Sequence, residues 1–303
     1  MPIIMFVKYR YMYNRKESKK NQKTERRLVE NRSPTIPNVL NLAAPSTDNF
    51  KCVTYKGKGF ISTPICVYEA DDDQIISANL IRGKVWQSDL VSIFRLILNA
   101  DPELDFVDLG ANLGLWTVVA LGLGRRVIAV EPFPPTAHRL RRTLQLGHFE
   151  PRVTLVTSPL SNVYQDVVFE MDGKNIGGTR IKDSRESSVK DEQRKLIKRT
   201  ATMDDLARII PASFTKAFMK MDIEGSELKA LNKSDKFLEV VNVPVITLEW
   251  RFFKSKVSSP EVRYFEAWFT RMGYKPYLMT LIKKQLKSLS PRTHGFRAKV
   301  EAH

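Results

Sequence analysis

The stretch DFVDLGANLG, residues 105–114, decides the fold of this chain. It begins as an apolar run that is typical of a buried β-strand and turns at Gly110. It continues directly into the apolar run 113–123, which predicts a helix. A strand, a glycine turn and a helix in this order are typical of ligand-binding units in α/β sheets, where the ligand lies at the carboxyl end of the strand.

Strands and helices alternate on both sides of this turn. The alternation predicts right-handed β-α-β units and an α/β fold, a mostly parallel twisted sheet with helices on both faces. Two runs that break the alternation, 165–171 and 176–181, predict an inserted β-hairpin, and the charged run 182–199 predicts an exposed loop. The predicted strands are 105–110, 125–131, 152–160, 217–225, 243–250 and 275–283, and the predicted helices are 84–99, 113–123, 135–146, 226–232 and 259–272.

The net charge of +16 belongs to the two ends of the chain. Residues 1–32 carry +7 and residues 251–303 carry +9, whereas residues 33–250 hold 27 charges of each sign. A neutral body argues against a nucleic-acid groove across the fold, while basic ends allow peripheral contact with an anionic membrane or an acidic partner. The predicted division is a flexible basic arm and linker (1–48), one α/β domain (49–285, with a leading segment 49–100 and a Rossmann-like core 101–285) and a basic tail (286–303).

Cys52 and Cys66 are the two cysteines, and they show no metal-ligand spacing. They could form one disulfide in a secretory protein, but two inert thiols are the default expectation because both lie in apolar, strand-like sequence. No apolar run is long enough for a transmembrane helix, and MPIIMFV (1–7) is too short for the core of a signal peptide. The expected location is the cytoplasm by default, or the secretory pathway if the N-terminus is incomplete.

The glycine turn argues against a dinucleotide phosphate. Gly110 and Gly114 are four residues apart and no third glycine completes the GxGxxG pattern. Asp108, at the end of the predicted strand, would repel a pyrophosphate and attract a ligand ammonium group. Glu131 ends the second strand, 21 residues beyond Gly110, where a carboxylate can bind both ribose hydroxyls. Adenosine with an amino group and no phosphate describes S-adenosylmethionine.

A second acidic group lies in the stretch FMKMDIEGSE, residues 218–227, where an apolar strand ends in acids. Asp222 and Glu224 are two residues apart, a spacing that places side chains on one face of a strand. Such a pair could hold a proton, a cation or a substrate hydroxyl, or it could cap the following helix. Glu249 and Arg251 end the next strand at the same edge of the predicted sheet.

These motifs together resemble the FkbM-type methyltransferases, which use S-adenosylmethionine. DLGANLG, AVEPFP, TMDDL, MKMDIEGSELKAL and TLEW stand in the order and spacing of that family over roughly residues 100–280, and the segment before them looks like that of its animal members. The resemblance implies a class I Rossmann-like fold with parallel central strands and an antiparallel final strand. It also implies O-methylation of a sugar or other small-molecule hydroxyl.

The resemblance also implies roles for individual residues. The departures from the family pattern are Ser158, which stands where an acidic adenine partner is expected, and the unusually charged loop 182–199. Leu160 is expected to lie near the adenine and to hold it through backbone groups. The expected cofactor residues are Asp108, Gly110, Asn112, Gly114, Glu131, Pro132, Leu160 and Asp222, and Gly225 belongs to the DIEG turn beside the reacting methyl.

Asp222 or Glu224 is expected to remove the proton of the acceptor hydroxyl, or to bind a divalent metal that lowers its pKa, although no metal ligand set is indicated. The predicted acceptor is a carbohydrate, a lipid or another small molecule. Two alternatives remain open: an RNA methyltransferase that holds RNA with its basic ends, and a non-catalytic S-adenosylmethionine-binding protein on the same fold. The sequence does not predict the oligomeric state.

Overall fold

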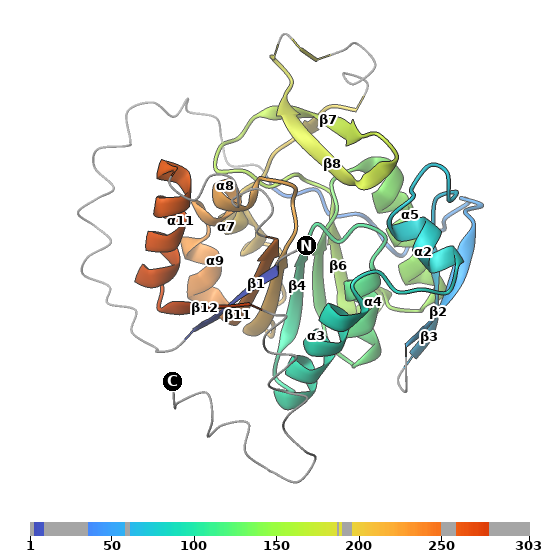
Figure 1. Ribbon diagram of the computed structural model, residues 1–303, viewed down its shortest axis with the longest axis horizontal. Coiled ribbons are helices and arrows are strands. Elements are labelled where there is room, and N and C mark those ends of the chain that lie inside the picture. Colours follow the sequence, from blue (N-terminus) through green and yellow to red (C-terminus); the bar gives the residue numbers. More distant parts are fainter. Residues whose placement is uncertain are drawn as a thin grey trace.

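The structure is a computed structural model, and it describes most of the chain outside the two basic ends (Figure 1). Most of the predicted arm (9–35) and the whole predicted tail (286–303) lie outside the described residues. No helix in the described ranges is long and apolar enough to cross a bilayer. The described residues are 3–8, 36–57, 61–186, 188–189, 196–249 and 259–278.

A seven-stranded sheet forms the centre of the fold, in the order β12-β1-β11-β10-β4-β5-β6. The four pairings from β11 to β6 are parallel, as the alternation of strands and helices predicts. The strands are β1 (Ile3–Lys8), β4 (Asp105–Leu109), β5 (Val127–Val130), β6 (Val153–Val156), β10 (Lys216–Met221), β11 (Asn242–Glu249) and β12 (Tyr274–Leu278).

Helices cover both faces of this sheet, and Figure 1 shows the two groups on opposite sides of the strands. One face packs against α3 (Ser88–Ala100), α4 (Leu115–Gly122) and α5 (Pro134–Leu146), and the other against α7 (Met203–Leu206), α8 (Glu227–Leu231), α9 (Asp235–Val240) and α11 (Pro260–Arg271). The short helices α2 (Ile76–Ile81) and η1 (Glu150–Arg152) belong to connections. This is the predicted Rossmann-like α/β fold, a mostly parallel sheet with helices on both faces.

The two-residue period of the strands divides the core into these two layers. In β10, Phe218 faces α3, where its ring lies 5.1 Å from that of Phe94, whereas Met219 belongs to the layer on the opposite face. Because both faces are covered, all five residues of β4 are buried, and the carboxylates of Asp105 and Asp108 are buried with its three apolar side chains.

Residues 3–8 depart from the prediction of a flexible arm, which covered residues 1–48. Ile3–Lys8 forms β1, which lies between β11 and β12 and runs antiparallel to both. Phe6 is buried and its ring stacks on that of Phe269 in α11 (3.6 Å between centroids). The apolar run before Lys8 is therefore a sheet strand, because its alternate side chains are buried on both faces of the sheet.

The direction of the last strand is also different from the expectation. β12 pairs antiparallel with β1, and β1 pairs antiparallel with β11, so β12 runs in the same direction as the core strands. The antiparallel strand of the described sheet is the first one, not the final one. The insertion of β1 between β11 and β12 is the reason, because it reverses the chain direction once between them.

The predicted linker packs along the outer edge of the sheet. Val39 forms a bridge with Val156 of β6, and the Leu40 amide donates to the carbonyl of Leu155 (2.8 Å). The amide of Asn38 donates to the hydroxyl of Ser158 (2.8 Å). This segment therefore satisfies backbone groups at the edge of β6 that would otherwise be unpaired.

A small hairpin, β2 (Cys52–Gly57) with β3 (Ile61–Cys66), packs against α5. Cys52 and Cys66 are opposite one another in its register and form a disulfide, so the expectation of two separate thiols is wrong. The sequence could not reveal this pairing, because only the antiparallel register of the two strands places the two sulfurs together.

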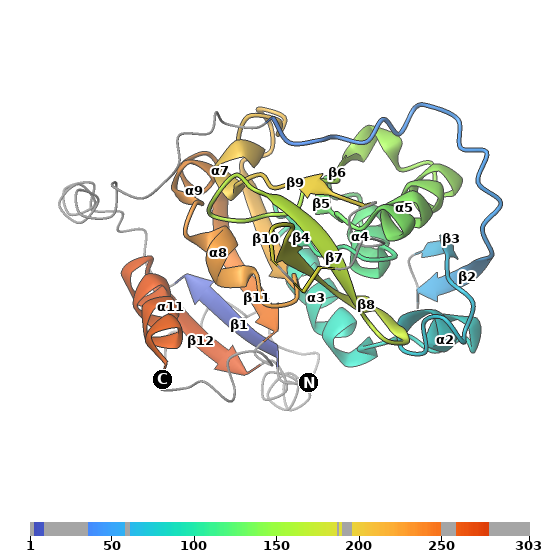
Figure 2. The ribbon, with the colours of Figure 1, turned by 90° about the horizontal axis from the view of Figure 1, so that it is seen from above.

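The predicted inserted hairpin is present as β7 (Asp166–Asp172) and β8 (Asn175–Asp183), with β9 (Lys198–Arg199) added beside β7. Seen from above in Figure 2, it crosses over β4 and β10. The run predicted as a loop, 182–199, therefore begins and ends in strands.

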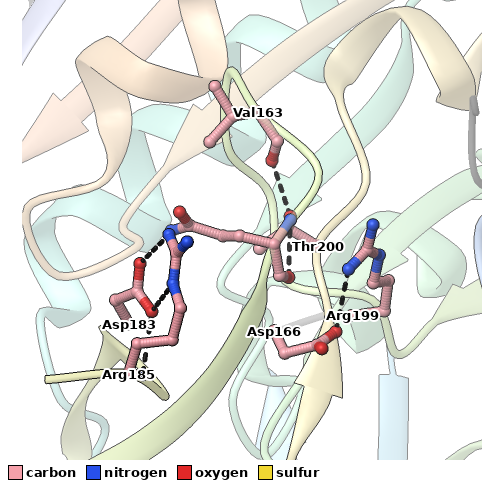
Figure 3. Close-up of polar contacts among 7 residues, drawn as sticks. Val163, Asp166, Asp183, Arg185, Arg199 and Thr200 are labelled. Atoms are coloured by element: carbon pink, nitrogen blue, oxygen red, sulfur yellow. Dashed lines mark hydrogen bonds and ion pairs between the residues drawn. The ribbon is translucent and has the colours of Figure 1, made fainter. Parts of the chain in front are cut away.

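Polar contacts close the base of this hairpin (Figure 3). The Thr200 hydroxyl donates to the Val163 carbonyl (2.6 Å), and Arg199 pairs with Asp166 (3.1 Å). Arg185 pairs with both carboxylate oxygens of Asp183 (3.0 and 2.8 Å). The first two contacts join the two ends of the insertion, whereas the Asp183–Arg185 pair is local to the end of β8.

Candidate functional site

A cavity lies at the carboxyl ends of β4, β5 and β10, beneath the β7–β8 hairpin. Its position is the edge at which open α/β sheets bind their ligands. Phe169, Ile176, Gly177 and Thr179 of the hairpin face it from above. Seven of the predicted site residues line it: Gly110, Asn112, Glu131, Pro132, Leu160, Asp222 and Glu224.

The glycine turn touches the loop that follows β10. Gly110 has a φ of 81°, and a Cβ atom there would lie 1.8 Å from the carbonyl oxygen of Asp222. The Asp222 amide in turn donates to the carbonyl of Leu109 (3.0 Å). Only glycine permits this approach, because it combines a left-handed backbone with the absence of a side chain.

Asn112 stands in the turn with a φ of 52°, a conformation that asparagine tolerates better than most residues. Its side-chain oxygen accepts from the Leu113 amide (2.7 Å). From above, its amide nitrogen lies against Gly177 of the hairpin, where a Cβ would be only 2.6 Å away. The turn and the hairpin therefore close on one another at Asn112.

Gly114 does not line the cavity. It precedes α4 with a φ of 88°, and a Cβ there would lie 2.4 Å from Leu140 of α5. Its geometry serves the close packing of the two helices, so the predicted contact of Gly114 with a cofactor stays a prediction.

Glu131 follows β5 and is 7% exposed. One carboxylate oxygen accepts from the Asn112 amide (2.8 Å) and the other from the Phe133 amide (3.0 Å). Burial raises the pKa of this carboxyl to about 7, although the two amides stabilise its ionised form. The carboxylate thus ties the glycine turn to the end of β5 while facing the cavity.

Asp108 is fully buried and is not part of the cavity wall. It accepts from the Thr117 hydroxyl (2.7 Å) and from the ammonium group of Lys220 (3.3 Å). Burial raises the pKa of Asp108, and Lys220 and Thr117 act in the opposite direction. The cation that Asp108 contacts in this structure is therefore one that belongs to the protein.

Lys220 was missed in the sequence analysis. It faces the cavity from β10, is 7% exposed, and pairs with Asp108 in the strand register. Burial lowers the pKa of the ammonium, but the carboxylates of Asp108 and Asp222 raise it more, and it lies above its usual value. The available signal was a lysine between two methionines in the apolar run that starts at Ala217, two residues before Asp222.

Asp222, Glu224 and Glu249 form an acidic cluster at the cavity. One carboxylate oxygen from each lies within 4.8 Å of the other two, and oxygen ligands of this kind suit Mg²⁺ or Ca²⁺. Glu224 has a φ of 54°, which turns the chain sharply after Asp222. The cluster confirms that the ends of β10 and β11 bring these acids together, whereas Arg251 lies outside the described residues.

The end of β6 is arranged differently from the family pattern. Leu160 lines the cavity, whereas Ser158 is buried and accepts from the Asn38 amide. Position 158 therefore carries no acid at the cavity. Its serine contacts the segment before β2 through Asn38 instead.

Glu227 is a second residue that sequence reasoning missed. It is fully buried at the start of α8, where one carboxylate oxygen accepts from the amides of Ile223 (3.0 Å) and Gly225 (3.3 Å). The other oxygen has no hydrogen-bond partner among the described residues. Burial raises the pKa of Glu227 to about 7. This carboxyl group shapes the loop that carries Asp222 and Glu224.

One comparison with known proteins identifies the family of this site. The profile described as "Methyltransferase FkbM domain" matches residues 108–276, more than half of the chain. The match begins at Asp108, before the glycine turn, and contains every residue that the sequence analysis placed in the site. No curated protein and no solved structure gives a significant match.

Proposed function

The chain belongs to the FkbM methyltransferase family, and we propose that it transfers the methyl group of S-adenosylmethionine to a hydroxyl group of a carbohydrate, lipid or other small molecule. The observation that carries the proposal is the place of Glu131. Its buried carboxylate faces the cavity at the end of β5, beside the glycine turn, where a ribose would be held.

The residues of the cavity fit the parts of this methyl donor. Each Glu131 oxygen accepts one amide and keeps a second lone pair, so the carboxylate can also accept from two ribose hydroxyls. Pro132, Phe133 and Leu160 offer apolar surface for an adenine. Lys220 and Asp222 supply one cationic and one anionic group for an amino acid moiety.

The donor supplies an electrophilic sulfonium methyl group, and the protein must hold the acceptor hydroxyl in line with it. Alignment of this kind contributes up to about 7–11 kcal/mol to lowering a barrier. In our proposal Asp222 or Glu224 accepts the hydroxyl proton, which contributes about 10²–10⁴-fold in rate. Support comes from the placement of both carboxylates on the cavity wall.

The acidic cluster also bears on the alternative acceptors. Carboxylates at the reacting end of the cavity disfavour an acceptor with a phosphate close to its hydroxyl, as in RNA. We therefore place neutral hydroxyl acceptors first and test RNA alongside them.

Calorimetric titration with S-adenosylmethionine tests the donor site, with Glu131→Ala as the variant and Glu150→Ala, in η1, as its control. We expect the first variant to lose at least tenfold in affinity and the second to bind as the wild type does. Unchanged binding by Glu131→Ala would remove the basis of the proposal.

Incubation with radiolabelled methyl donor and separate glycan, lipid and RNA fractions then identifies the acceptor. Label in the glycan or lipid fraction, resistant to mild base, supports transfer to a hydroxyl. Label in RNA alone would favour the RNA alternative. Binding without label in any fraction would favour a non-catalytic protein.

A further inference from the structure

Lys220 is held at the cavity by two acceptors below the glycine turn. Its ammonium group donates to the Gly110 carbonyl (3.0 Å) and to Asp108 (3.3 Å). Asp108 is itself fully buried, and it also accepts a hydrogen bond from the Thr117 hydroxyl. The Lys220 ammonium is thus fixed in position between the ends of β4 and β10.

This arrangement leaves part of the ammonium group for a ligand. A lysine ammonium has three N–H donors, and two of them have hydrogen-bond acceptors here. Asp222 is the next nearest anion at 3.6 Å, which is an ion-pair distance rather than a hydrogen bond. The third donor is therefore available on the side of the cavity that Lys220 lines.

Lys220 is also the only cationic side chain among the described residues that line the cavity. The other charged groups there are the carboxylates of Glu131, Asp222, Glu224 and Glu249. Among these residues, Lys220 is therefore the one with which the carboxylate of a ligand can form an ion pair.

We propose that Lys220 binds the carboxylate of the amino acid moiety of the methyl donor, and that Asp108 holds Lys220 in place. The inference rests on the proposed function, because it assumes that the cavity takes S-adenosylmethionine. It revises the sequence-based expectation that Asp108 meets the ammonium group of the ligand. In the structure the Asp108 carboxylate pairs with the Lys220 ammonium, and it is this ammonium that lines the cavity.

Two ligands that differ only in the carboxylate test this proposal. S-adenosylmethionine and its decarboxylated analogue share the adenosine, the sulfonium and the amino group. Hydrogen bonds to charged groups are among the stronger ones in proteins, so we expect the wild type to bind S-adenosylmethionine about 10- to 100-fold more tightly than the analogue. A wild-type ratio near one overturns the proposal.

The Lys220→Met variant assigns that preference to one side chain. Its affinity ratio for the two ligands should fall to about one, because methionine has an unbranched side chain that is only one atom shorter than that of lysine and carries no charge. Loss of affinity for both ligands by the same factor, with the ratio retained, would mean that Lys220 is only structural and would overturn the proposal. Lys216→Met is the matched control, because Lys216 begins the same strand and pairs with Asp101 (2.7 Å) away from the cavity. It should keep the wild-type ratio.

Removal of Lys220 alone leaves Asp108 as an unpaired buried charge, which can prevent folding. The double variant Asp108→Asn/Lys220→Met avoids this and should also give a ratio of about one. A folded double variant with the wild-type ratio contradicts the inference. If the wild type binds neither ligand, the proposed function itself fails; if it binds both equally, only the role of Lys220 fails.

Discussion

A Cβ atom on Gly110 would lie 1.8 Å from the carbonyl oxygen of Asp222, so the glycine turn and the DIEG loop are in direct backbone contact. The contact joins the two segments that carry most of the candidate site. It also means that neither segment can move away from the sheet edge without the other losing its position.

The first prediction concerns this contact. Gly110→Ala should lower the free energy of unfolding by about 1–3 kcal/mol or more, and should abolish measurable S-adenosylmethionine binding, because backbone atoms must shift to admit the methyl group. Gly124→Ala is the control, because Gly124 has a similar φ (82°) but no atom within 4 Å of the new Cβ. Urea denaturation and calorimetry measure the two effects; equal losses in both variants would contradict the steric explanation.

The second prediction concerns pH and Glu131. Its pKa of about 7 means that, below pH 7, the carboxyl group of the free protein must lose a proton before both of its oxygens can accept from the ribose hydroxyls. The affinity for S-adenosylmethionine should therefore fall as the pH is lowered below about 7, by at most about tenfold per unit, and should be constant above it. Glu131→Gln should bind more weakly with little dependence on pH between 5 and 8. The same pH dependence in both proteins would exclude Glu131 as its source.

The third prediction concerns stability and Glu227. The pKa of Glu227 is about 7 in the folded protein and 4.5 for the ordinary side chain. Between these two pH values Glu227 is protonated in the folded protein and ionised in the unfolded chain. Its contribution to stability is thus complete below about pH 4.5 and is lost as the pH rises to about 7. Between pH 5 and pH 8, Glu227→Gln should gain about 1–3 kcal/mol relative to the wild type. Denaturation curves of both proteins at the two pH values measure the difference, and a constant difference would contradict the prediction.

The fourth prediction concerns the disulfide. Cys52→Ala/Cys66→Ala should lower the free energy of unfolding by about 2–4 kcal/mol, because the bond closes a short loop in the unfolded chain. A reducing agent should lower the stability of the wild type toward that of the variant and leave the variant unchanged. If thiol titration finds two free cysteines in the untreated, unfolded wild type, the bond does not form in solution.

The fifth prediction concerns β1. Phe6→Ala should cost about 3–5 kcal/mol, because the ring is buried against Phe269 between β1 and α11. Leu96→Ala, which removes a side chain that is 53% exposed on α3, should change the stability by no more than about 0.5 kcal/mol. Thermal or urea unfolding decides; a small effect of Phe6→Ala would mean that β1 is not needed for a stable sheet.

The core and its glycine turn could be predicted because their signals are local. DFVDLGANLG contains a strand, a left-handed glycine and a helix start within ten residues, and Glu131 is identified by its distance from them. Lys220 could not be recognised in this way, because a lysine in an apolar strand acquires its meaning from Asp108 on the neighbouring strand. β1 and the disulfide have the same difficulty, since their partners are set by sheet register rather than by nearby residues.

The place of β1 also has a consequence for the order of folding. Among the described strands it is synthesised first, yet Ile3 pairs with Glu249 and Ile4 pairs with Leu278. During translation β1 must therefore wait for both partners, and β12 cannot join the sheet before β1 does. Contacts between such distant segments slow folding and leave strand edges open in the meantime. The half of the sheet that carries the glycine turn and Glu131 can assemble before the edge that β1 completes.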